Sequence, residues 1–161
     1  MANLVEAADS DSELGKMTEA AIGVLAETDT DDPELIGIEE LPMSVLQARI
    51  AAAVESFGVP LADARVLADM TTRSESAPHV ARTVLTSLSS DVALSEEISD
   101  AYSRRAELMV IDPLTISAAA LLLLTLKIRR VKVSRQGVDI SLDPLKQGMI
   151  QALLSSISGS S

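Results

Sequence analysis

The chain has 161 residues, the length of about one domain, and 47% of them are apolar, so it can bury a core without disulfides or structural metal ions. It contains no cysteine, which excludes disulfides, thiolate metal sites and cysteine nucleophiles and favours a reducing, cytoplasmic location. Its only aromatic residues are Phe57 and Tyr102, so the core must be built from aliphatic side chains.

The net charge of −11 is confined to the first part of the chain. Residues 1–46 hold 12 acidic side chains and one basic one, Lys16, a sum of −11, whereas the remaining residues hold 12 of each sign. Such an excess of like charge keeps a segment solvated. We therefore expect residues 1–42 to form an acidic, largely flexible arm with a short helix over residues 17–27. The arm would repel phosphates, so we expect no nucleic-acid partner.

Residues 28–42 have the composition of a linker. The sequence TDTDDPELIGIEELP combines turn-forming Asp and Pro residues with two acidic clusters. A calcium loop counted from Asp29 would need a glycine at its sixth position, where Glu34 stands. We therefore expect no metal site here, and we expect the linker to be accessible to a protease.

Four amphipathic helices are predicted after the linker. The first begins near Pro42, with Ser44 as its N-cap, and the second begins at Pro60. Gly58 separates them, and a turn this short favours an antiparallel pair.

The third helix begins near Pro78, and Val80, Val84, Leu85 and Leu88 mark its apolar face. The fourth extends from Leu94 to about residue 108, with Ser95 as the candidate cap.

The last third of the chain changes character. The sequence LTISAAALLLLTL after Pro113 is apolar on every side, which predicts the most buried helix of the protein. Its apolar run is shorter than the roughly 20 residues that a membrane span needs, so we expect no span. A β-hairpin is predicted over residues 127–142, with a turn at Gln136-Gly137, and an amphipathic helix over residues 144–158.

These elements predict a mainly α, α+β fold. We expect the domain at residues 43–158 to be a helical bundle that ends in the β-hairpin and the amphipathic helix. An isolated hairpin is marginally stable, so it must pack on helices or pair with a further strand.

A cluster of basic residues coincides with the hairpin. Five positive charges fall within nine residues: Lys127, Arg129, Arg130, Lys132 and Arg135. Such charges can mark a solvated strand edge that resists unwanted pairing. They can also form a docking surface for an acidic partner, or for the chain's own acidic arm, and an unpaired hairpin edge can accept a strand from another protein. We take this basic cluster as the candidate partner-binding site.

Residues with the potential for catalysis are scarce. His79 is the only histidine, and no GxSxG, GxxxxGK[ST] or GxGxxG motif occurs. Lys127, Lys132 and Lys146 sit among other charges or on an amphipathic helix, whereas a nucleophilic lysine needs apolar surroundings. We therefore expect a protein that is not an enzyme and that uses no cofactor.

Residues 113–158 carry a further resemblance. Their sequence includes LTISAAALLLLTLKIRRVKVSRQGVDISLDPLKQGMIQALL, in which an all-apolar helix leads into a basic strand, a glycine turn, a second strand and an amphipathic helix. This order resembles small accessory proteins of bacterial conflict and antiviral defence systems. The resemblance implies an adaptor or regulatory partner for an effector such as a protease.

The sequence therefore predicts a non-enzymatic, protein-binding adaptor or regulatory component. The alternative is a protease substrate or cargo protein that is released by cleavage within residues 28–42. Assembly of the chain with copies of itself stays open at this point.

Overall fold

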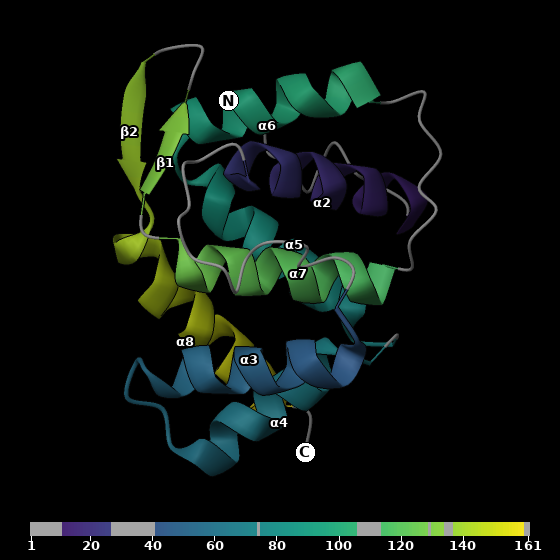
Figure 1. The fold of residues 1–161 in the computed structure, drawn as a ribbon, viewed down its shortest axis with the longest axis vertical. Helices are drawn as coiled ribbons and strands as arrows, with labels where there is room; N and C mark the ends of the chain where they lie inside the picture. Colours follow the sequence, from purple (N-terminus) through teal and green to yellow (C-terminus); the bar gives the residue numbers. More distant parts are fainter. Residues whose placement is uncertain are drawn as a thin grey trace.

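Helix α7 (Leu114–Lys127) forms the centre of the molecule because none of its sides is polar. Every residue from 117 to 126 is buried, which agrees with the prediction for this segment. Helices α2 (Asp11–Ala26), α3 (Met43–Glu55) and α5 (Ala77–Ser89) all pack against it (Figure 1).

The computed structural model describes residues 11–26, 41–73, 75–105, 114–128, 130–133 and 137–159. The elements that complete it are α4 (Leu61–Thr71), α6 (Val92–Arg105), β1 (Arg130–Val133), β2 (Val138–Ser141) and α8 (Asp143–Gly159). The predicted fold class, a mainly helical bundle, is confirmed. Within the described ranges, no helix is both long and apolar enough to cross a membrane.

The strands β1 and β2 pair in antiparallel fashion, in the region predicted to form a hairpin. Val131 lies opposite Ile140, and both are buried, so this pair attaches the sheet to the helical body. Gly137 has a φ of 63°, a left-handed conformation that glycine adopts without strain. Gln136, the other residue of the predicted turn, lies outside the described residues, as do residues 134 and 135.

Helix α2 corrects the expectation of a flexible arm. The sequence predicted a largely flexible arm over residues 1–42 with a short helix over 17–27, but the helix begins at Asp11. It packs against α6 and α7, and its inner face belongs to the core. The buried side chains of that face are Leu14, Met17, Ala20, Ala21, Ile22, Val24 and Leu25. Burial of this apolar face outweighs the local excess of negative charge. Residues 1–10 and 27–40 of the predicted arm lie outside the described residues.

The predicted N-caps were placed wrongly at two helices. Ser44 lies inside α3, whose N-cap is Pro42. Ser95 lies inside α6 and is buried, and Asp91 caps that helix because its Oδ1 accepts a hydrogen bond of 3.1 Å from the backbone N–H of Leu94. A carboxylate in this position also interacts favourably with the positive end of the helix dipole.

Helices α3 and α4 form the antiparallel pair that the short turn predicted. Gln47 in the first turns of α3 donates a hydrogen bond of 3.3 Å to the carboxylate of Asp69, near the end of α4. Gly58 follows the end of α3 with a φ of 89°, a left-handed conformation that favours glycine, which explains the glycine between the two helices. The pair lies at the opposite end of the molecule from the β-sheet (Figure 1).

Candidate partner-binding surface

The basic cluster begins at the end of the central helix. Lys127 is the last residue of α7, where a positive charge interacts favourably with the C-terminal end of the helix dipole. Arg130 and Lys132 are positions of β1, on either side of the buried Val131. Arg129 and Arg135 lie outside the described residues.

The register of the sheet sets acidic and polar residues beside these basic positions. Lys132 is paired with Asp139, and Arg130 is paired with Ser141. Asp139 and Ser141 are exposed. The register therefore places two basic positions of β1 beside one acidic and one polar position of β2.

The two strands differ in their surroundings. β1 lies beside α6, whereas β2 lies at the outside of the molecule (Figure 1). In the described part of the chain, β2 is hydrogen-bonded to β1 alone, so its second edge has no strand partner. An edge of this kind can accept a strand from another protein.

Two acidic residues of α2 join the N-terminal helix to its neighbours. The carboxylate of Glu13 accepts hydrogen bonds from the hydroxyl of Tyr102 in α6 and, at 3.4 Å, from Lys16. Glu19 accepts one of 3.0 Å from the hydroxyl of Ser117 in α7. The hydrogen bond from Tyr102 lowers the pKa of the Glu13 carboxyl below its usual value; partial burial opposes this effect, and the charge of Lys16 adds to it.

Replacing Tyr102 with phenylalanine is expected to lower the midpoint of thermal unfolding by a few degrees at neutral pH, because the Glu13 carboxylate loses its strongest donor. The pKa of Glu13 is lower in the folded state, so the stabilisation is present above the pKa of the unfolded chain. It is lost as the pH falls through the folded pKa. Thermal unfolding between neutral and acidic pH should show the difference between the two proteins shrinking. In a Glu13→Gln background, Tyr102→Phe should have little pH-dependent effect. If the difference in unfolding midpoint between the unchanged protein and Tyr102→Phe is the same at all pH values, the hydrogen bond to the Glu13 carboxylate is not its cause.

Lys146 is buried, which corrects the expectation that it lies outside apolar surroundings. Its ammonium group forms an ion pair of 3.2 Å with Asp143 and lies 5.7 Å from the centre of the Phe57 ring. A cation at this distance is attracted to the face of an aromatic ring. Lys146 therefore attaches the first turns of α8 to the residues that follow α3.

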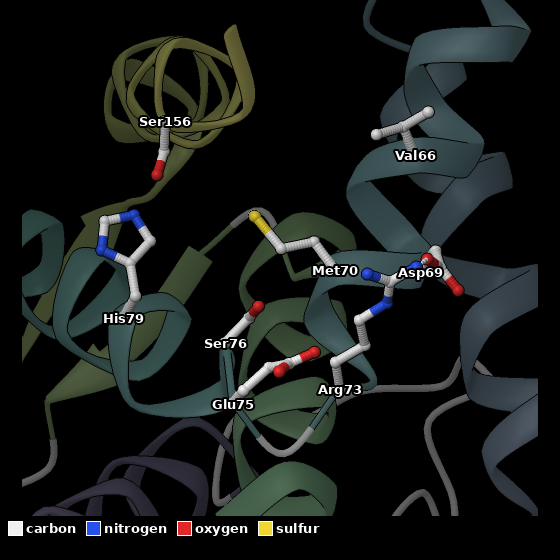
Figure 2. A pocket seen from close by; sticks show the side chains of 8 residues that line it. All are labelled: Val66, Asp69, Met70, Arg73, Glu75, Ser76, His79 and Ser156. Carbon is white, nitrogen blue, oxygen red and sulfur yellow. Dashed lines mark ion pairs between the residues drawn. The ribbon is translucent and has the colours of Figure 1, made fainter. Parts of the chain in front are cut away.

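A hollow of about 350 Å³ lies between α4, α5 and α8. Figure 2 shows His79 of α5 and Ser156 of α8 on one side of it, and the ion pair between Arg73 and Asp69 of α4 on the other. Within the described residues, the imidazole of His79 makes no hydrogen bond. The hollow therefore brings polar groups together without forming a hydrogen-bonded pair of nucleophile and base.

A second hollow, of about 540 Å³, lies between α3 and α4. Small side chains of α3, Ala48, Ala51 and Ala52, line one side, and Leu61 and Arg65 of α4 line the other. The sequence pattern did not predict this surface, although Leu61 and Val66 of α4 are apolar. Both side chains are exposed, at 42% and 48%. The spacing of Ala64, Leu67, Ala68 and Thr71 by three and four residues marks the face that is buried and could have distinguished it.

No group of three or more histidine, aspartate or glutamate side chains in the described part of the chain is arranged to hold a metal ion. In comparisons with known proteins, no protein-family model, no curated protein and no solved structure matches this chain.

Proposed function

We propose that this protein is a non-enzymatic adaptor or regulatory component that binds an acidic segment of a partner protein along β2 and the basic cluster. The observation that carries the proposal is the position of β2, which lies at the outside of the molecule with one edge unpaired in the described sheet (Figure 1). Main-chain hydrogen bonds along such an edge provide affinity, and neighbouring side chains provide specificity.

The charges next to this edge favour an acidic partner. Arg130 and Lys132 belong to β1, the strand that is paired with β2, and Lys127 ends the helix that precedes β1. Positive charge beside an open edge favours encounter with an acidic strand and opposes a basic one. Since these attractions are screened over about 10 Å at 0.1 M salt, binding should weaken as salt is added. An effector of a bacterial defence system, such as a protease, is the partner that the resemblance of residues 113–158 implies.

Site-specific photo-crosslinking tests the proposal. A photo-reactive amino acid at Asp139, which is exposed on β2, should capture one partner protein in living cells. The same group at Glu55, exposed at the end of α3, should not capture it. Reversing the charges of Arg130 and Lys132 to glutamate should reduce the captured amount about tenfold or more, since each charged contact contributes roughly 1 kcal/mol.

The matched control reverses Arg82 and Arg104, two basic residues on helices outside the sheet. The control variant should capture the partner as the unchanged protein does. Equal loss in both variants would attribute the effect to net charge alone, and capture from Glu55 but not from Asp139 would overturn the proposed surface.

The alternative of release by cleavage within residues 28–42 concerns a segment of which only 41 and 42 are described. Helix α2, which precedes the segment, packs against α6 and α7, which follow it. A cut in the segment would therefore leave α2 bound to the rest of the protein by its buried face. Limited proteolysis followed by size-exclusion chromatography under native conditions separates the two functions: co-elution of both fragments is expected here, and release of the core is expected of a cargo protein.

A further inference from the structure

Helix α4 has an unusually exposed outer face. Its inner face is formed by the buried residues Ala64, Leu67, Ala68 and Thr71. Two of the three large apolar side chains that are exposed in the described residues, Leu61 and Val66, belong to this helix. Single exposed apolar residues are ordinary, but two on one short helix make it a candidate contact surface.

The helix also forms a ridge between the two hollows described above. Arg65 and Asp69 line the hollow on the α3 side. Val66, Met70 and Arg73 line the hollow on the side of α5 and α8 (Figure 2). A ridge between two hollows leaves room for a second helix to lie against α4.

The charged residues of α4 and the turn after it alternate in sign. In chain order they are Asp63, Arg65, Asp69 and Arg73. When the same four residues are read in reverse, the signs are opposite at every position, so a basic residue stands where the forward order has an acidic one. Asp69 and Arg73 form an ion pair with each other. Asp63 and Arg65 form no ion pair within the described part of the chain. The pattern is complementary to itself when two copies of the helix run in opposite directions.

We propose that α4 is a self-association surface, on which two copies of this chain pair through antiparallel α4 helices about a two-fold axis. With the axis at the level of Leu67 and Ala68, Asp63 of each copy lies within about one residue of the level of Arg73 in the other, and Arg65 within one residue of Asp69. When two antiparallel helices are related by a two-fold axis, residues on one flank of the contact in the first helix lie next to residues on the same flank of the second. Helical periodicity places Arg65 and Asp69 on one side, and it places Asp63 on the other, near Met70.

Val66 lies near the middle of this contact. The two copies of Val66 would be separated by about 4.5 Å along the helix axis, since three residues rise 1.5 Å each. Their exposed side chains would therefore meet across the axis, with Met70 beside them. The surface lies away from β2 and the basic cluster, so self-association and partner binding are independent proposals (Figure 1).

Sedimentation equilibrium of the full chain from about 1 μM to about 1 mM tests the pairing. The mass should rise from one copy to two with concentration and fall again as salt is added. Asp63→Arg and Arg73→Asp should each weaken the dimer about tenfold, because each brings like charges together at two symmetric contacts. An equimolar mixture of these two variants should dimerise again, since opposite charges meet at both contacts of the mixed pair.

Glu96→Arg makes the same charge change as Asp63→Arg at an exposed position of α6 and should leave dimerisation unchanged. Circular dichroism and thermal unfolding of each variant separate loss of folding from loss of pairing. A chain that stays a single copy throughout the concentration range would overturn the proposal. So would a mixture that associates no better than its components, or a Glu96→Arg variant that weakens the dimer as Asp63→Arg does.

Discussion

Truncation of Leu25 to alanine is expected to lower the free energy of unfolding by about 2–5 kcal/mol. Leu25 has no exposed surface and lies on the inner face of α2, which packs against α6 and α7. Its loss would leave a cavity between α2 and helices that are distant from it in the sequence, and this cavity cannot close without moving a whole helix. Chemical denaturation measured by circular dichroism gives the difference directly.

Leu61→Ala provides the matched control for this measurement. It is the same chemical change on the outer surface of α4, where the side chain is 42% exposed, and it should alter stability by about 0.5 kcal/mol or less. A Leu25→Ala variant as stable as the Leu61→Ala variant would mean that α2 adds little to the core. It would restore the flexible arm that the charge distribution predicted.

Enlarging Ala119 to leucine is expected to destabilise the protein by about 1–3 kcal/mol. Three consecutive alanines of α7, at 118–120, have no exposed surface, and α2, α3 and α5 all pack against this helix. Small side chains let surrounding helices approach closely, so added methylene groups must displace a helix or adopt an unfavourable rotamer. Thermal and chemical unfolding of the variant give the size of the effect.

Ala52→Leu is the corresponding change at an exposed position of α3 and should have an effect of about 0.5 kcal/mol or less. Equal destabilisation by the two substitutions would contradict the central position of α7. A stabilising effect of Ala119→Leu would indicate an unfilled space beside the helix.

The packing of α2 changes how the acidic N-terminal region can act. The charge distribution predicted a mobile arm that could reach the basic cluster. Glu13 and Glu19 instead belong to a helix that hydrogen-bonds to α6 and α7 through Tyr102 and Ser117. The negative charges of Glu13 and Glu19 are therefore held at fixed places on the molecule. If these residues regulate binding, they must act through the electrostatic potential of charges at fixed positions and not by moving to the basic cluster.

The predictions from the sequence were most accurate for elements whose local residue pattern allows only one structure. The apolar spacing of Val80, Val84, Leu85 and Leu88 predicted the buried face of α5 correctly, and all four are buried. The uninterrupted apolar run of α7 predicted the central helix. The caps were less certain, because Asp91 and Ser95 are both suitable residue types, and the geometry of α6 selects Asp91. For the candidate site, the sequence predicted the basic cluster but not the exposed face of α4.

Four features could be predicted from residue patterns alone: the helical fold class, the central position of α7, the antiparallel pair of helices on either side of Gly58, and the place of the two strands. Each of these depends on residue spacing and turn chemistry over short distances. The packing of the folded chain was needed to show that α2 belongs to the core, that Lys146 is buried beside Phe57, and that α4 presents Leu61 and Val66 to solvent. These outcomes depend on which surfaces pack against one another. The charge and hydrophobicity of a segment do not determine its burial until the fold brings it into contact with other segments.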